Sequence, residues 1–411
     1  MVSEKMYDKL AELAVKKGAN VQKDQPVIIT SSIQNADFVK KVVRYAYEAG
    51  ARYVSVDWSD MDLTKMAYQY QSEEVLAEVP QWKYDKRKYQ QDGGCCYIHI
   101  TSEEPGALAD VDSEKINIAN KAFYSKMEDL VPYTMNNEGQ WCVVGLPTVE
   151  WARVVFPDLS DEEAFEKLGD AIFAVTRVTE DNDPIAEWEA HDKEMMEHAD
   201  KMNEYCFKTL HFTSELGTDL YVDLIDDHIW VGGGCFTPAG VFFDPNMPTE
   251  EVFCMPTKTG VNGIVYSSKP LDYNGKVIED FWLKFEDGKV VDYDAKKEKE
   301  ALTKLLTFDE GSSRLGEVAL VPYDSPVSQS GILFFNTLYD ENAACHLALG
   351  RPYPENLKGG VEMSKEEFEA CGANDSMEHV DFMIGTRETS VDGIKADGEV
   401  VPVFRNGNFV F

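Results

Sequence analysis

The fold of the first half of the chain is indicated by residues 26–57, which read PVIITSSIQNADFVKKVVRYAYEAGARYVSVD. The apolar run Val27–Thr30 predicts a buried strand, and Tyr53–Asp57 predicts a second one. Between them, residues 36–49 repeat apolar side chains at helical spacing, and Gly50 ends the predicted helix. A strand, a helix and a strand in this order favour a right-handed crossover between parallel strands.

The same alternation continues along the first half. Further apolar strands are predicted at Cys96–Ile100 and Trp141–Leu146, with helical patterns near residues 114–129 and 161–175. Strands separated by helices are typical of a largely parallel sheet covered on both faces. We therefore expect an α/β domain over residues 1–183, without a phosphate-binding glycine loop after any of its strands.

A second domain is predicted because the sequence pattern changes after residue 183. Residues 184–206 form a long polar pattern that predicts a helix beginning at Pro184, a residue suited to a first helical turn. Beyond it, short strands separated by Gly, Pro, Asn and Asp are predicted at Leu220–Leu224, Gly263–Ser267, Phe281–Phe285 and Val318–Val321. Together these elements predict an α+β, β-rich domain over residues 184–411.

The charge of the chain excludes two classes of partner. Its 39 basic and 74 acidic residues leave a net charge of −35, and such a surface repels nucleic acid and anionic membranes. No apolar stretch has the length of a signal-peptide core or a membrane span, and the eight cysteines contain no CxxC pattern. We therefore expect a cytoplasmic, soluble protein with neither a disulfide framework nor a structural zinc knuckle.

The segment HVDFMIG, which begins at His379, contains a candidate metal-binding pair. In a strand, side chains two residues apart leave the same face, so His379 and Asp381 can bind one metal ion. The alternative is a core histidine that pairs with an aspartate for structural reasons.

A second histidine lies in YDENAACHLALGRPYP, residues 339–354. Glu341 and His346 are five residues apart, which is a poor spacing for one helical face. They converge if Glu341 precedes a short helix over about residues 342–349, and Tyr353 then lies in a loop close to His346.

Two glutamates complete the candidate set. Glu251 lies in NMPTEEVFCMP and Glu317 in RLGEVALVPY, each at the start of an apolar strand. Burying such a charge is unfavourable unless it is paired or bound to a metal; the alternative is a solvated strand end. Carboxylate and imidazole ligands without cysteine suit Zn²⁺, Co²⁺ or Mn²⁺, and this set can supply the bridging and terminal ligands of a dinuclear centre.

Four motifs in this order, PTEEVF, LGEVALV, DENAACHLALGRPYP and NDSMEHVDFMIG, resemble those of the aminopeptidase T family, which includes the aminopeptidase S (PepS) enzymes. The resemblance implies a dinuclear site for Zn²⁺, Co²⁺ or Mg²⁺ whose ligands are Glu251, Glu317, Glu341, His346, His379 and Asp381. It also implies that Glu317 bridges the two ions, that a glutamate of the set is the general base, and that Tyr353 stabilises the tetrahedral intermediate. The implied function is hydrolysis of the N-terminal peptide bond by a metal-activated water, acting on peptides with a free N-terminus, in a homodimer.

Two other functions use the same residues. One is another dinuclear hydrolase, a dipeptidase or a phosphoesterase, although a phosphoesterase favours nearby cations and only Arg351 and Arg387 lie close to the motifs in sequence. The other is a non-catalytic protein that binds a metal or a peptide. The presence of every ligand type together with Tyr353 favours the aminopeptidase.

Overall fold

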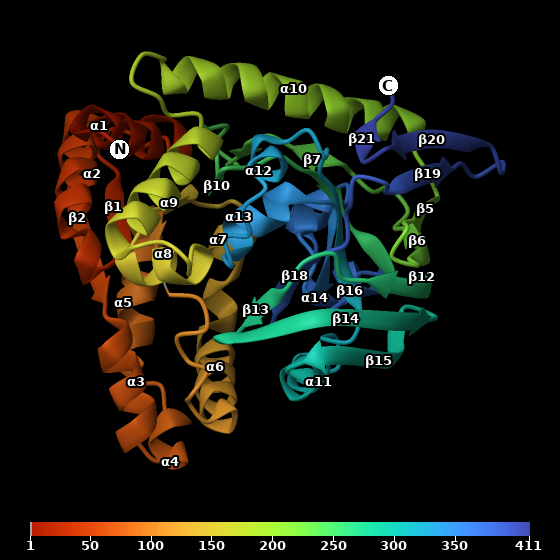
Figure 1. Cartoon of the computed structure of the whole chain (residues 1–411), viewed down its shortest axis with the longest axis horizontal. Coiled ribbons are helices and arrows are strands. Elements are labelled where there is room, and N and C mark those ends of the chain that lie inside the picture. The colour runs from red at the N-terminus through yellow and green to blue at the C-terminus, as the bar shows by residue number, and fades with distance from the viewer. Residues whose placement is uncertain (1, 103) are drawn as a thin grey trace. The chain divides into compact units, whose positions relative to one another are not determined.

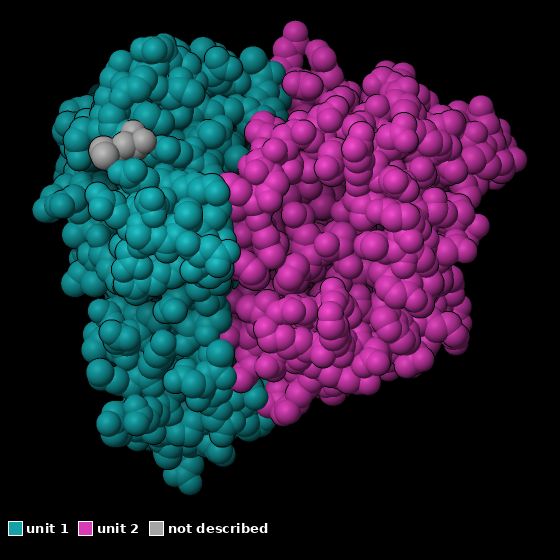
Figure 2. All heavy atoms as spheres, viewed as in Figure 1, with its two compact units in different colours: residues 1–191, 234–249 teal, residues 192–233, 250–411 magenta. Residues whose placement is uncertain are grey.

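The computed structural model describes residues 2–102 and 104–411. The chain forms two compact units, which Figure 2 colours separately: unit 1 contains residues 1–191 and 234–249, and unit 2 contains residues 192–233 and 250–411. The segment 234–249 therefore departs from the predicted division at residue 183. It joins unit 1 because its strand β10 pairs with β4 of that unit.

Unit 1 is an α/β unit with a parallel sheet, as the sequence predicts. The strand order is β10-β4-β3-β1-β2, and each of these pairings is parallel. The bounds are β1 Pro26–Ser32, β2 Tyr53–Ser59, β3 Cys96–Thr101, β4 Trp141–Gly145 and β10 Asn246–Met247, and a short hairpin is formed by β8 Cys235–Phe236 and β9 Phe242–Phe243.

The helices of unit 1 follow the predicted pattern closely. In α2, Ala36–Glu48, the buried residues Phe38, Val42 and Ala46 recur at helical spacing on one face. The remaining helices are α1 Glu4–Leu13, α3 Met61–Tyr70, α4 Glu73–Leu76, α5 Gln81–Asp92, α6 Ser113–Met127, α7 Pro132–Met135, α8 Val149–Val155 and α9 Asp161–Val175. The long helix α10, Pro184–Tyr205, begins at the predicted proline and continues into the residues of unit 2. Across residues 2–102 and 104–411, every helix is too short or too polar to cross a lipid bilayer.

Unit 2 is built from two antiparallel sheets; Figure 1 labels β16 and β18 of the first and β12 and β14 of the second. The first sheet has the order β18-β17-β16-β11-β7, with β7 Val231–Gly232, β11 Val252–Cys254, β16 Leu315–Leu320, β17 His346–Gly350 and β18 His379–Met383. The second has the order β13-β14-β12-β6-β5-β19-β20-β21, and β15 pairs with β14. Its bounds are β5 Thr209–Thr213, β6 Asp219–Leu224, β12 Pro256–Tyr266, β13 Leu271–Tyr273, β14 Lys276–Glu286, β15 Lys289–Lys297, β19 Ser390–Ile394, β20 Val400–Arg405 and β21 Asn408–Phe409. The helices are α11 Lys299–Leu306, α12 Pro326–Gln329, α13 Thr337–Asp340 and α14 Lys365–Ala370.

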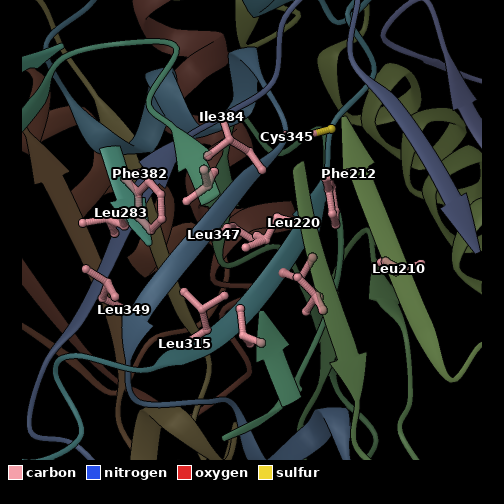
Figure 3. Close-up of a cluster of buried hydrophobic side chains, with 14 of the residues drawn as sticks. Leu210, Phe212, Leu220, Leu283, Leu315, Cys345, Leu347, Leu349, Phe382 and Ile384 are labelled. Atoms are coloured by element: carbon pink, nitrogen blue, oxygen red, sulfur yellow. The ribbon is translucent and has the colours of Figure 1, made fainter. Parts of the chain in front are cut away.

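The hydrophobic core of unit 2 is formed by side chains of both sheets. Figure 3 shows Leu315, Leu347, Leu349 and Phe382 of the first sheet in one cluster with residues of the second, among them Leu220. Side chains alternate along a strand, so Ala348, between Leu347 and Leu349, leaves the opposite face of the first sheet, and so does Asp381, next to Phe382. A register shift between Leu315 and Glu317 pairs Glu317 with Ala348 and brings it to that face as well.

Candidate metal centre

The centre is organised by the register of three neighbouring strands. Ala348, in the middle strand β17, lies opposite Glu317 of β16 on one side and Asp381 of β18 on the other. His346 lies two residues before Ala348 on the same face, and His379 lies opposite Gly350. Strand pairing therefore brings residues far apart in sequence to one face of the sheet.

The expectation of a helix over about residues 342–349 is wrong. Glu341–Ala343 form a single 3₁₀ turn, and His346 begins the strand β17. The segment is a strand because Leu347 and Leu349 alternate with His346 and Ala348, which directs the leucines into the core and His346 towards the centre.

The two histidines approach opposite oxygens of one carboxylate. His346 Nε2 lies 3.5 Å from Glu317 Oε1, and His379 Nε2 lies 3.6 Å from Glu317 Oε2. His346 Nε2 is also 2.9 Å from Glu251 Oε2, and His379 Nε2 is 3.3 Å from Asp381 Oδ1. Glu317 is thus shared by two groups of three ligands, and within each group the ligand atoms lie within 4.8 Å of one another.

Each imidazole is oriented by its other nitrogen. His346 Nδ1 is 3.1 Å from the Ala344 carbonyl oxygen, and His379 Nδ1 is 2.6 Å from that of Arg351. A carbonyl oxygen only accepts hydrogen bonds, so each Nδ1 is the donor. Each Nε2 is therefore directed at the carboxylates, which is the arrangement typical of metal-binding histidines.

The site glutamates are buried, so the interpretation of Glu251 and Glu317 as solvated strand ends is wrong. Their exposed fractions are 9% and 3%. Burial raises the pKa of Glu317 to about 7, although His346 and His379 act in the opposite direction. Burial alone would lower the pKa of His379, but the neighbouring Asp381 and Glu317 outweigh it and raise that pKa to about 10. The buried carboxylates therefore favour the binding of positive charge at this site.

The donor atoms fit divalent ions. Among the described residues, Glu251 Oε2 and Asp381 Oδ1 are buried without a hydrogen-bond partner, although each lies near an imidazole nitrogen. Unpaired buried carboxylate oxygens are rare unless a cation satisfies them. One nitrogen and carboxylate oxygens in each group match the ligand preferences of Zn²⁺, Co²⁺ or Mn²⁺.

Glu341 lies near the two groups but belongs to neither. Burial raises its pKa well above the usual range, and the charges of Asp381 and Glu251 raise it further. The structure therefore brings Glu341 into electrostatic contact with the centre, while its oxygens lie outside both three-residue groups.

Tyr353 lies beside His379. Its ring makes an edge contact with the His379 ring, with centroids 5.0 Å apart, and another with Phe253 at 5.7 Å. Burial and the surrounding carboxylates raise the pKa of Tyr353 well above its usual value, so its hydroxyl stays protonated and can donate a hydrogen bond.

Sequence reasoning missed two residues of this face, Ala348 and Phe253. Ala348 lies between two carboxylates in the strand row, and Phe253 supports the ring of Tyr353. The signal that could have found both is the period of two that places them on the same face as His346 and Glu251.

The family model described as "Thermophilic metalloprotease (M29)" matches residues 3–409. Aminopeptidase 2 of Geobacillus stearothermophilus is 45% identical over 408 residues, covering 99% of this chain and 98% of that protein. Aminopeptidase AmpS of Bacillus subtilis is 46% identical over 401 residues, covering 98% and 97%. The solved structure of wild-type AmpT from Thermus thermophilus is similar with a TM-score of 0.91 and 40% identity, covering 99% of this chain and 100% of that chain.

Proposed function

The chain belongs to the M29 family of metalloproteases and is a metal-dependent aminopeptidase, and we propose that its centre holds two divalent ions. The proposed ligands are Glu251, Glu317, Glu341, His346, His379 and Asp381. The observation that supports this proposal best is that the two oxygens of Glu317 face two different imidazoles, each with its own further carboxylate. A carboxylate in that position is suited to bridge two ions.

The chemistry divides between the ions and the side chains. Bound divalent ions supply Lewis acidity, which lowers the pKa of water and polarises a scissile carbonyl. We propose that a glutamate of the set is the general base, and Glu317 is the first candidate because both ligand groups share it. Its carboxylate accepts the proton of the attacking water and returns it to the leaving amine. Glu341 is the second candidate for this role, because its oxygens lie outside both ligand groups.

Tyr353 is proposed to act on the developing oxyanion. Its protonated hydroxyl donates a hydrogen bond to the carbonyl oxygen as negative charge accumulates there. The ring contacts with His379 and Phe253 hold the side chain in place before substrate binds.

The substrates in this proposal are peptides with a free N-terminus, because the carboxylate-rich centre attracts an ammonium group. We further propose that Zn²⁺, Co²⁺ or Mg²⁺ activates the enzyme and that it works as a cytoplasmic homodimer without nucleic-acid or membrane partners, in keeping with the net charge of −35. The phosphoesterase alternative loses support, because the relatives of this chain are named aminopeptidases. Light scattering of the purified protein tests the homodimer.

The decisive experiment is hydrolysis of a panel of aminoacyl-p-nitroanilides, each with a free and an N-acetylated amine. Metal-depleted protein is assayed alone and with Co²⁺, Zn²⁺ or Mg²⁺. We expect metal-dependent cleavage of the free-amine substrates alone, and its loss in His346→Ala and His379→Ala. His211→Ala is the matched control, because His211 stacks on Tyr221 in the other sheet of the same unit. Normal turnover in the two site variants would contradict the ligand assignment.

A further inference from the structure

A loop outside the metal centre is bound to the start of strand β18 through one carboxylate. Asp309, which follows helix α11, accepts hydrogen bonds from the Gly311 and Ser312 amides at 2.9 Å each. It also accepts hydrogen bonds from the Ser376 hydroxyl, which lies 2.9 Å from each carboxylate oxygen, and from the Met377 amide at 2.7 Å. Asp309 therefore joins its own loop to the two residues that lie two and three positions before His379.

Arg351 links the same segment to the imidazole of His379. Its amide donates to the Glu378 carbonyl oxygen at 2.7 Å, and its Nε donates to that of Ser376 at 2.7 Å. Its own carbonyl oxygen accepts from His379 Nδ1 at 2.6 Å. The Ser376 hydroxyl oxygen also receives the Glu378 amide at 3.2 Å. Ser376, which is hydrogen-bonded to Asp309, is thus also hydrogen-bonded to Arg351, and the carbonyl oxygen of Arg351 orients His379.

The junction leaves no room for displacement. Asn374 Nδ2 donates to the Gly311 and Gly350 carbonyl oxygens at 2.9 and 2.7 Å. A Cβ on Gly311 would lie 1.7 Å from the Asp375 carbonyl oxygen, and one on Gly350, whose φ is +107°, would lie 2.1 Å from that of Glu378. Three chain segments are therefore packed backbone against backbone, so that a shift at Asp309 is transmitted to the entry of β18.

We propose that Asp309 is a positioning residue that holds His379 for one of the two metal ions, an inference that rests on the proposed dinuclear site. The ion bound by His379 and Asp381 depends on Asp309, whereas the ion bound by Glu251 and His346 does not. The reason is that His346 is oriented locally, by the carbonyl of Ala344 two residues earlier. Residues that hold a metal ligand in this way typically contribute about 10- to 100-fold to metal affinity.

The test is a calorimetric titration of the metal-depleted full chain with Co²⁺. It is carried out on wild type, Asp309→Ala, Ser376→Ala and Asp309→Asn. We expect two binding steps in wild type. In Asp309→Ala and Ser376→Ala one step weakens by about 10- to 100-fold while the other stays within about twofold. Asp309→Asn, which keeps one acceptor oxygen, is expected to lie between. The matched control is Asp397→Ala, which removes another turn aspartate of unit 2, one that accepts the Glu399 amide.

A double variant separates positioning from general damage. In a His379→Ala background the Asp309→Ala change is expected to weaken Co²⁺ binding no further, whereas in a His346→Ala background its full effect remains. At saturating Co²⁺ the KM of Asp309→Ala should equal that of wild type and kcat should recover. Equal weakening of both steps, an unchanged titration, or additivity with His379→Ala would overturn the assignment of Asp309. A wild type that binds no pair of ions would instead overturn the proposed function.

Discussion

Ala348 lies directly opposite Glu317 in the antiparallel ladder between β16 and β17. On its other side it lies opposite Asp381 of β18. The side chain that lies between these two carboxylates is therefore only a methyl group. Because this residue is small, Glu317 Oε2 and Asp381 Oδ1 can both approach His379 Nε2, at 3.6 and 3.3 Å.

Ala348→Leu should remove the metal centre by filling it. Ala348 is fully buried, so a larger side chain must displace its neighbours, at about 1–3 kcal/mol of folding stability. We expect kcat/KM to fall on the order of 100-fold, with loss of bound metal measured by elemental analysis. Ala348→Gly is the control, because it adds no volume and should keep its metal. An Ala348→Leu enzyme with full metal content would show that the space opposite Glu317 is not part of the centre.

The shared position of Glu317 predicts an unequal pattern among the carboxylates. Glu317→Gln should weaken both ions and lower kcat by about 100- to 10,000-fold if it is also the base. Glu251→Gln and Asp381→Asn should each weaken one ion, because each belongs to one ligand group. Co²⁺ titration of the three variants measures this pattern. If all three lose the same single ion, Glu317 does not bridge.

Metal removal should lower the stability of the protein as well as its activity. Without cations, buried carboxylate oxygens of Glu251 and Asp381 are left without hydrogen-bond partners. A ligand that binds only the folded state stabilises it by about 2.7 kcal/mol at 100 times its Kd. We therefore expect Tm to rise with Co²⁺ concentration in wild type and to respond less in His346→Ala. A Tm that EDTA leaves unchanged would argue against a buried metal centre.

Glu378 predicts a pH dependence of the metal-free protein. Burial raises its pKa from 4.5 to about 7, although a hydrogen bond from Tyr273 acts against this. The folded state then binds a proton more tightly than the unfolded state, so this group makes the protein less stable as pH rises from about 4.5 to about 7. Glu378→Gln should therefore gain on the order of 2 kcal/mol relative to wild type between pH 4.5 and pH 8, measured by urea unfolding. Glu310→Gln, at an exposed position of the neighbouring loop, is the control.

Periodicity in the sequence was sufficient to predict an element where the local pattern and the burial agree. His379 and Asp381 were expected on one face of a strand, and β18 has this geometry. For the segment around His346 the sequence suggests a short helix that would bring Glu341 and His346 together and end at Gly350. Its conformation is decided instead by pairing on both sides, with β16 and with β18, and such nonlocal contacts leave no mark in the segment itself.

The same limit applies to the domain division. The strand β10 is only Asn246–Met247, too short for any periodic signal, yet its pairing with β4 draws residues 234–249 into unit 1. Similarly, the position of Asp309 in sequence says nothing of Ser376, since a turn of one loop meets the start of a strand 67 residues away. The candidate ligands could be proposed from the sequence, but the residues that orient their side chains could not.

Tyr353→Phe separates oxyanion stabilisation from metal binding. Phenylalanine keeps the ring contacts with His379 and Phe253 and removes the hydroxyl alone. Loss of one preorganised donor typically lowers kcat by about 100- to 1,000-fold, and we expect that fall with KM and Co²⁺ affinity unchanged. Steady-state kinetics on a free-amine aminoacyl-p-nitroanilide, with Co²⁺ titration in parallel, measure both. A variant with normal kcat would remove Tyr353 from the reaction, whereas weakened Co²⁺ binding would mean that its hydroxyl supports the metal ligands and not the oxyanion.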